Sequence, residues 1–338
     1  MPGSEAPDAA HPGAGAAAAA LSAGEDIGAC LRLAQTYGGQ LPVPGSGRTW
    51  RRWQVLVDVA ALNLTAARVL EAHTDALAIL AEAGEVPAPG LWGVFAAEAA
   101  DVQLVGRSGR DGWALDGTKP WCSLAAHLDH ALVSARVGSA RRLFAVDLAH
   151  PSVQVEPPSG WVARGLRHVP SGPVHFTGAP ARPVGGPGWY LSRPGFAWGG
   201  IGVAACWYGG ARGLAERLRS VAATRADPLS ALSVGRVEVA LHAARTSLLD
   251  AAAEIDAGHA RGRAGELLAL RVRSVVAGAV ELTLSQVGHT LGPAPLAFDE
   301  DHARRVADLE IYVRQHHADR DLAALGHLLL DTAAGSTP

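Results

Sequence analysis

A segment near the middle of the chain combines an aromatic and a hydroxyl side chain at a spacing suited to a flat ligand. It runs from Gly112 to Ser123, with the turn-forming pair Asp116–Gly117 inside it and Trp121 two residues before Ser123. We expect a strand, a tight turn at Asp116–Gly117 and a second strand, in which Trp121 and Ser123 point to the same side. An indole beside a hydroxyl offers packing and one hydrogen bond, which suits a flat heterocycle such as a flavin.

Two other patterns are weaker. Gly200–Ala205 matches the GxGxxA dinucleotide fingerprint, but Arg193–Trp198 before it is a poor strand and a helical pattern follows it. We interpret these glycines as close packing at the start of a helix. Histidine pairs such as His316 and His317 lack the spacing of zinc ligands, so no metal is expected.

The elements that must position these residues fall into three consecutive parts. Residues 1–24 are rich in Ala, Gly and Pro and are expected to form a disordered tail. Apolar residues recur every three or four positions from Trp53 to Ala83, which predicts a long helix in a short helical N-terminal domain, residues 25–89. Short apolar runs between Gly, Pro and Asp predict a β-barrel over residues 90–190, and a returning helical period predicts a four-helix bundle over residues 195–332. The fold class is therefore α+β, mainly α.

Composition excludes several classes of protein. The chain has 338 residues with 29 basic and 32 acidic side chains, so it lacks the charge of a nucleic-acid partner. Its three cysteines fit neither a disulfide framework nor a zinc cluster. Pro194–Ala211, the longest uncharged stretch, is short and poor in Leu and Ile, so we expect a buried helix start there and no membrane span. No positively charged signal-peptide start precedes Arg32, and a cytoplasmic location is expected.

In this order of parts, the chain resembles the acyl-CoA dehydrogenase family of flavoproteins. That family has a helical N-terminal domain, a middle β-barrel and a C-terminal four-helix bundle. Its glycine–threonine–lysine turn, followed by an aromatic and a hydroxyl residue, matches five positions here: Gly117, Thr118, Lys119, Trp121 and Ser123. The resemblance implies FAD, with Trp121 packed on the isoalloxazine, Ser123 hydrogen-bonded near N5 and Cys122 between them.

The resemblance also assigns the rest of the FAD, although these motifs are eroded. Ala97 would offer its backbone N–H to the pyrimidine ring, and Arg225 would reach the diphosphate. Gln286 would meet the adenine side across a subunit contact, which implies a homodimer or homotetramer. No Phe-Gly follows Arg225, and His289 and Thr290 replace the paired glycines after Gln286.

The resemblance places a catalytic carboxylate at Glu310. His302-Ala303-Arg304 is similar to the family's Arg-Asp-Ala motif with His in place of Asp, and Glu310 lies eight residues after His302. A carboxylate there would remove the α-proton of an acyl thioester, carried by coenzyme A or a carrier protein, while the β-hydride passes to the flavin. Glu238 and Glu254 are weaker candidates for this base.

Two alternatives stay open. A flavin-dependent monooxygenase on the same fold would lack the Glu and place a histidine near the flavin, with His316 and His317 as the candidates. A flavin-free scaffold or binding protein that kept the fold would explain the eroded diphosphate and adenine motifs.

Overall fold

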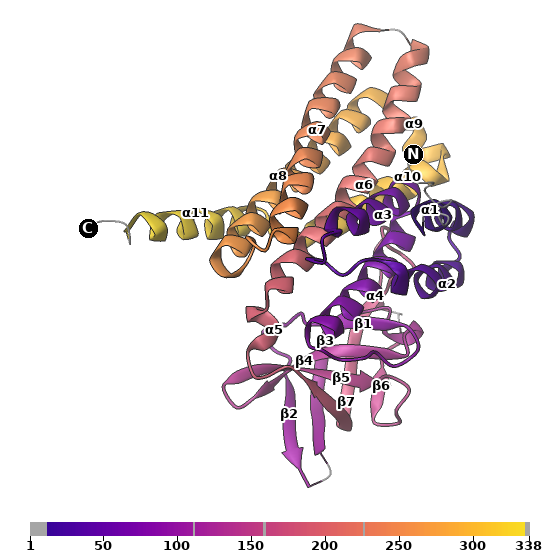
Figure 1. The fold of residues 1–338 in the computed structure, drawn as a ribbon. Coiled ribbons are helices and arrows are strands. Elements are labelled where there is room, and N and C mark those ends of the chain that lie inside the picture. The colour runs from indigo at the N-terminus through magenta and orange to yellow at the C-terminus, as the bar shows by residue number, and fades with distance from the viewer. Residues whose placement is uncertain (1–11, 111, 158–159, 226, 335–338) are drawn as a thin grey trace, which may run out of the picture.

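The structure, a computed structural model, describes residues 12–110, 112–157, 160–225 and 227–334 (Figure 1). Helices come first along the chain, strands follow, and helices return. In Figure 1 the strands lie at the bottom, while the long helices rise from them. No helix among the described residues is long and apolar enough to cross a membrane.

The front of the chain is helical. Its elements are α1 (Pro12–Ala23), α2 (Ile27–Tyr37), η1 (Gly38–Gln40), α3 (Thr49–Leu62) and α4 (Leu64–Glu82). The expectation of a disordered tail is wrong for residues 12–23, because Ala16 and Ala20 of α1 are completely buried; residues 1–11 lie outside the described part. Alanine has the highest helix propensity and loses no side-chain entropy, so this Ala-rich segment folds once a surface covers it.

The helix expected from Trp53 to Ala83 is two helices. Asn63 separates α3 from α4 with an extended backbone, and its side chain accepts a hydrogen bond from the Ala66 N–H at 3.0 Å. The Asn63 amide also donates to the carbonyl oxygen of Gly24 at 2.8 Å. A periodicity count cannot detect this break, because an N-cap residue interrupts a helix without interrupting its apolar spacing.

The middle of the chain is a barrel. Its strands are β1 (Trp92–Phe95), β2 (Leu104–Gly109), β3 (Gly112–Ser123), β4 (His130–Val137), β5 (Ala140–Asp147), β6 (Val153–Val155) and β7 (Ser171–Val184), with the short helix η2 (Ala125–His127) after β3. Pairings run β4–β2–β3–β7–β5 and back to β4, which closes a ring; β1 pairs with β4 and β6 with β7. Side chains alternate as a barrel requires: Val133 packs inside, whereas Leu132 packs with Ile79 and Leu80 of α4.

The turn expected at Asp116–Gly117 is wrong, because β3 runs without interruption through both residues. Gly117 has φ +118°, and a Cβ there would overlap the carbonyl oxygen of Gln103. Glycine is therefore required by a close backbone approach. The chain instead reverses between Gly109 and Gly112, which pair across the β2–β3 hairpin; Asp111 lies outside the described residues.

The back of the chain is helical again. Its elements are α5 (Trp189–Ser192), α6 (Pro194–Arg225), α7 (Pro228–Asp256), α8 (Gly262–Leu291), α9 (Ala294–Phe298), α10 (Glu300–Tyr312), η4 (Val313–Gln315) and α11 (Asp319–Ala334). Pro194–Ala211 is a helix start with a largely buried face, as expected, and Gly200–Ala205 lies inside α6 rather than after a strand.

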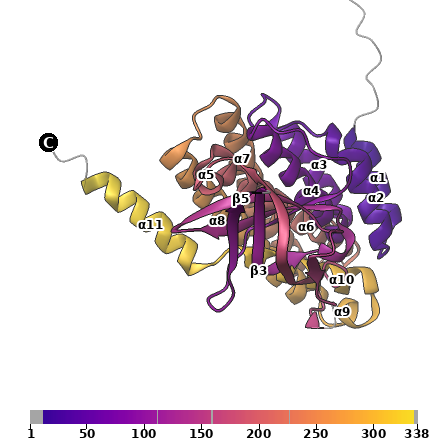
Figure 2. The ribbon, with the colours of Figure 1, turned by 90° about the horizontal axis from the view of Figure 1, so that it is seen from below.

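The fourth helix of the expected bundle is interrupted. After α10 the chain forms η4, and Ala318 takes the left-handed value φ +49°. Helix α11 then projects away from the other helices, as Figures 1 and 2 show. Leu322, Leu329 and Leu330 on α11 are exposed, so these residues of the expected fourth helix do not pack into the bundle core. The three longest helices of the described residues are α6, α7 and α8.

Candidate functional site

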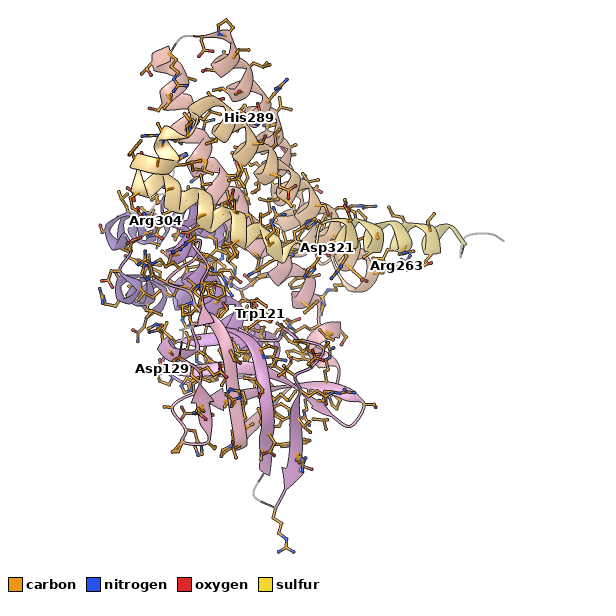
Figure 3. The ribbon with its side chains drawn as sticks, turned by 180° about the vertical axis from the view of Figure 1, so that it is seen from behind. Trp121, Asp129, Arg263, His289, Arg304 and Asp321 are labelled. Carbon is orange, nitrogen blue, oxygen red and sulfur yellow. The ribbon has the colours of Figure 1, made fainter. Side chains whose placement is uncertain are left out.

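Trp121 lies where the strands meet the helices (Figure 3). It sits in β3 at a register shift between Lys119 and Cys122, its indole is 58% exposed, and its backbone has φ +58°. A bulky residue in the left-handed region is strained, and such residues persist where the surrounding structure fixes them, often at ligand sites. The indole is therefore presented outward by a backbone shaped for that purpose.

Ser123 lies at the seam between β3, β7 and α4. Its hydroxyl oxygen is 2.7 Å from that of Ser171, and Arg68 of α4 donates to it at 3.3 Å. Cys122 points the other way: its side chain is buried in the barrel interior, and its thiol donates to the Lys119 carbonyl at 3.2 Å. Burial raises the pKa of this thiol to about 12, so it stays protonated near neutral pH.

Lys119, the only lysine of the chain, holds two parts of the expected flavin site together. Its buried ammonium donates to the Ser134 hydroxyl at 2.8 Å, and Ser134 donates to the Ala96 carbonyl at 3.4 Å. Burial lowers the pKa of Lys119 to about 8. The exposed Ala97 follows Ala96 directly. The loop that holds Ala97 is thus tied to the strand that carries Trp121.

A polar cluster from α4 and α10 faces Ser123. Arg68 and Glu71 form an ion pair at 2.8 Å, with their side chains only 13% and 10% exposed. Tyr312 of α10 donates its hydroxyl to Glu71 at 3.2 Å. Burial raises the pKa of Glu71, and the Arg68 charge opposes that shift. The sequence gives little sign of this cluster, because Arg and Glu three apart usually mark a solvated helix face.

A second group extends the cluster toward α6 and α8. Trp207 is completely buried, its indole nitrogen has no hydrogen-bond partner among the described residues, and its ring centre is 6.4 Å from those of Tyr312 and His316. His316 Nε2 lies 3.1 Å from the Ser274 hydroxyl oxygen, and burial lowers the pKa of His316. His317 is exposed and contacts Asp321. The structure therefore brings His316 into the cluster and leaves His317 outside.

Glu310 is exposed on α10. An α-helix turns about 100° per residue, so Glu310 lies roughly 160° around the helix from both Asp308 and Tyr312, which face the interior. The expected base is therefore not brought into the cluster by the fold of one chain. The weaker candidates are also engaged elsewhere: Glu238 pairs with Arg219, and Glu254 with His259.

Arg225 and Gln286 lie near the far end of the long helices. Arg225 is exposed and donates to the carbonyl oxygen of Thr290 at 2.5 Å, while Gln286, one turn before Thr290, is buried. At 1.5 Å per residue, Arg225 lies about 27 Å along α6 from Trp207. Within one chain these residues do not meet the Trp121 site, so their expected roles require a second copy.

Asp308 fastens α10 to the loop before β7. One carboxylate oxygen accepts from the Leu166 N–H at 2.6 Å, and the other accepts from Thr65 at 3.5 Å. The approach is close enough that a Cβ on Gly165 would overlap the Ala307 carbonyl oxygen. Burial raises the pKa of Asp308 to about 6.

This raised pKa predicts a pH-dependent effect of Asp308→Asn. A carboxyl that titrates near 6 when folded and near 4 when unfolded stabilises the fold only at low pH, and that contribution is lost as pH rises through 6. Asparagine keeps an acceptor for Leu166 and does not titrate. We expect the variant to gain roughly 1 kcal/mol relative to the parent between pH 5 and pH 8. Urea unfolding at both pH values measures this, and a difference that does not change with pH would contradict it.

No group of three or more His, Cys, Asp or Glu side chains in the described part of the chain is arranged to hold a metal ion.

Comparison with known proteins places the fold. No protein-family model matches the chain, and no curated protein matches it. Indole-bound TdsC from Paenibacillus sp. A11-2, a dibenzothiophene monooxygenase, superposes with a TM-score of 0.78 at 16% identity, over 95% of this chain and 96% of its own. KijD3 in complex with FMN and an amino-sugar nucleotide gives 0.77 at 18% identity, over 97% of this chain and 92% of its own.

Methanesulfinate monooxygenase MsuC from Pseudomonas fluorescens also gives a TM-score of 0.77, at 19% identity, over 97% of this chain and 96% of its own. Likeness at such low identity establishes the shared fold. The chain therefore has the acyl-CoA dehydrogenase-like fold that its sequence led us to expect, mainly helical with a central β-barrel.

Proposed function

We propose that this protein is a flavin-dependent monooxygenase. The observation that carries the proposal is the contrast between two expected residues: His316 lies in the buried cluster with Trp207 and Ser274, whereas Glu310 lies exposed on the outer face of α10. A dehydrogenase needs a carboxylate base at the substrate, and a monooxygenase does not. Further support comes from solved structures of the same fold, which include the monooxygenases TdsC and MsuC and a nitrososynthase.

The residues at Trp121 fit a flavin ring. Trp121 offers an exposed indole face, Ser123 offers a hydroxyl already oriented by Arg68, and the Ala97 loop is held beside them by Lys119 and Ser134. Stacking on one side and a few fixed hydrogen bonds on the edge are what a flat heterocycle requires.

Among flavins, FMN fits the chain better than FAD. The guanidinium expected to meet the FAD diphosphate, Arg225, is occupied by the Thr290 carbonyl. The neighbouring N-terminus of α7, which could otherwise bind a phosphate, is capped by Asp227, whose carboxylate accepts from the N–H groups of Leu229 and Ser230. A carboxylate at that position repels a diphosphate. FMN is also the flavin bound in TdsC and KijD3.

The proposed mechanism assigns the steps that depend on this chain's own residues. A reduced flavin supplies two electrons, so that one atom of dioxygen enters the substrate and the other leaves as water. Trp121 and Ser123 would hold the ring, and the buried Tyr312 and Trp207 would exclude water from the helical side. Burial lowers the pKa of His316, so the ring is neutral near pH 7. Its Nδ1 accepts from the Ala318 N–H at 3.3 Å, which leaves the ring proton on Nε2. Nε2 can therefore donate that proton, with the Ser274 hydroxyl oxygen 3.1 Å away fixing the imidazole orientation.

Spectra and oxygen uptake test this proposal. The purified protein, dialysed against FMN or FAD and desalted, should retain flavin absorbance. With NADH and an added flavin reductase, it should consume oxygen in proportion to the substrate converted. A protein that stays colourless after both dialyses would contradict the enzyme proposals and favour the binding-protein alternative. Flavin retention with reduction by an acyl thioester, and no oxygen incorporated, would favour the dehydrogenase.

Substitution of His316 separates the two chemistries. We expect His316→Ala to lower the rate of substrate oxygenation by about a hundredfold or more, the usual loss for a proton-transfer residue, while flavin stays bound. His242→Ala, at an exposed position on α7, is the matched control and should retain activity within about threefold. Glu310→Gln should behave like this control. Loss of activity in Glu310→Gln but not in His316→Ala would reverse the assignment.

A further inference from the structure

A cavity of about 750 Å³ lies on the opposite side of the cluster from the loop before β7, between the starts of α6 and α8 and the base of α11. Its lining includes Asp75, Tyr190, Phe196, Arg273 and Asp321. Figure 3 shows Asp321 at the base of the projecting α11. The volume falls in the range of sites for small organic ligands.

The cavity adjoins the proposed flavin site through α4. Arg68, Glu71 and Asp75 follow one another at spacings of three and four, so they share one face of that helix. Arg68 donates to Ser123 at one end, and Asp75 lines the cavity about 10 Å further along the helix. Arg273 makes a second connection, because it lines the cavity and packs 4.8 Å from the ring centre of Trp207.

Two carboxylates of the lining, Asp75 and Glu266, have no hydrogen bond and no ion pair among the described residues. Glu266 is exposed, whereas Asp75 is only partly exposed. Gly199 of α6 lies against it, and a Cβ at that position would come within 2.8 Å of its carboxylate oxygen. Burial raises the pKa of Asp75, and Arg193, Arg52 and Arg68 oppose that shift from a distance. A partly buried carboxylate without a partner has lost part of its hydration, and a cationic ligand in the cavity would replace it.

The cations of this lining are Arg193, Arg263 and Arg273. Arg193 pairs with Glu82 at 2.7 Å, although its Nε has no partner among the described residues, and Arg273 donates to the carbonyl oxygens of Gly200 and Gln315 at 2.7 and 2.8 Å. Asp321 contacts His316 and His317. The carboxylates of the lining that form no ion pair among the described residues are Asp75 and Glu266. The lining also has an aromatic face, because the Phe196 residue is 45% exposed and its ring packs edge-on against Tyr190 at 5.5 Å.

We propose that this cavity binds the ammonium group of an amine substrate, with Asp75 as its counter-ion and Phe196 as an aromatic face. A carboxylate and an aromatic ring together are the usual protein environment for an alkylammonium group. That the bound amine is a substrate rests on the proposed monooxygenase function. The binding of an ammonium group depends on the cavity alone.

Three probes of one shape test the charge preference. They are 3-phenylpropylamine, neutral 3-phenylpropanol and anionic 3-phenylpropionate, titrated at pH 7.5 by ligand-observed NMR or calorimetry. We expect the amine to bind at least about tenfold more tightly than the alcohol, and the carboxylate more weakly than either. If the parent protein binds the amine and the alcohol equally, or prefers 3-phenylpropionate, the proposal is overturned. This measurement needs no variant.

Asp75→Asn then tests the residue. The amine should fall to the affinity of the alcohol, whose own binding should not change. Asp331→Asn, at an exposed position on α11, is the matched control and should leave all three affinities unchanged. Asp75→Asn is expected to fold with a Tm at least as high as that of the parent, because it removes a partly buried carboxylate that has no ion pair among the described residues. Amine selectivity that survives in a folded Asp75→Asn variant would contradict the proposal.

The same samples separate this inference from the proposed function. FMN absorbance and oxygen uptake are recorded on the parent and on Asp75→Asn. Amine selectivity without flavin binding would reject the monooxygenase and leave the ammonium site in place. Flavin binding and oxygen uptake without amine selectivity would do the reverse.

Discussion

Replacement of Trp121 by alanine is expected to weaken flavin binding by about ten- to a hundredfold, which corresponds to roughly 1–3 kcal/mol for loss of one aromatic stack. The indole is 58% exposed, so its removal leaves no cavity in the barrel core. Alanine also tolerates φ +58° no better than tryptophan does, so the backbone strain stays the same. The change should therefore act on the ligand far more than on the fold.

The measurement is titration of the protein with FMN, followed by flavin fluorescence, with thermal unfolding of each variant alongside. Phe298→Ala is the control, because Phe298 on α9 is an aromatic side chain that is 89% exposed. We expect it to bind FMN like the parent. If Trp121→Ala binds FMN as tightly as Phe298→Ala, the isoalloxazine does not lie on Trp121.

Replacement of Arg68 by methionine is expected to destabilise the protein by about 3 kcal/mol, because it leaves the buried Glu71 without its counter-ion. The pair lies 2.8 Å apart and is mostly hidden from solvent, so water cannot replace the lost partner fully. Burial already raises the pKa of Glu71, and loss of Arg68 raises it further. The destabilisation should therefore be largest above pH 7, where ionisation of Glu71 opposes folding most strongly.

A second substitution tests the cause. The double variant Arg68→Met, Glu71→Gln removes the unpaired charge and keeps an acceptor for the Tyr312 hydroxyl, so it should recover most of the lost stability. Arg219→Met is the matched control on an exposed pair with Glu238 and should change the free energy of unfolding by less than about 1 kcal/mol. Urea unfolding at pH 7.5 measures all three. Equal losses for Arg68→Met and Arg219→Met would show that the Arg68–Glu71 pair is not buried in solution.

The region around Trp121 and Ser123 shows how much of a candidate site local sequence can predict. Trp121 and Ser123 were identified from residue type and spacing, and both lie where the barrel meets the helices. Their common orientation was inferred from regular strand alternation, which the register shift between Lys119 and Cys122 interrupts. The strain at Trp121 and the burial of Lys119 could not be read from the sequence, because both depend on strands paired from distant segments.

The helical side of the site was harder to predict. Glu310 and His316 are both polar residues near the end of α10, and periodicity alone does not decide which of them faces inward. The unpartnered Asp75 was equally hidden, because an Asp on an amphipathic helix is most often solvated. The approach of α6 at Gly199 covers part of that carboxylate.

The sequence by itself determined the order of helices, strands and helices and the helix start at Pro194, because apolar periodicity and Gly and Pro punctuation act over a few residues. It also led to the prediction that Trp121 and Ser123 on β3 hold a flat ligand. The tertiary structure decided that the Ala-rich front folds, that Asn63 divides one helix into two and that α11 leaves the bundle. It likewise decided that Arg68 and Glu71 form a buried pair, whereas Asp75 has no ion pair among the described residues. These outcomes depend on burial, and burial is set by segments that are far apart in the chain and meet only in the fold.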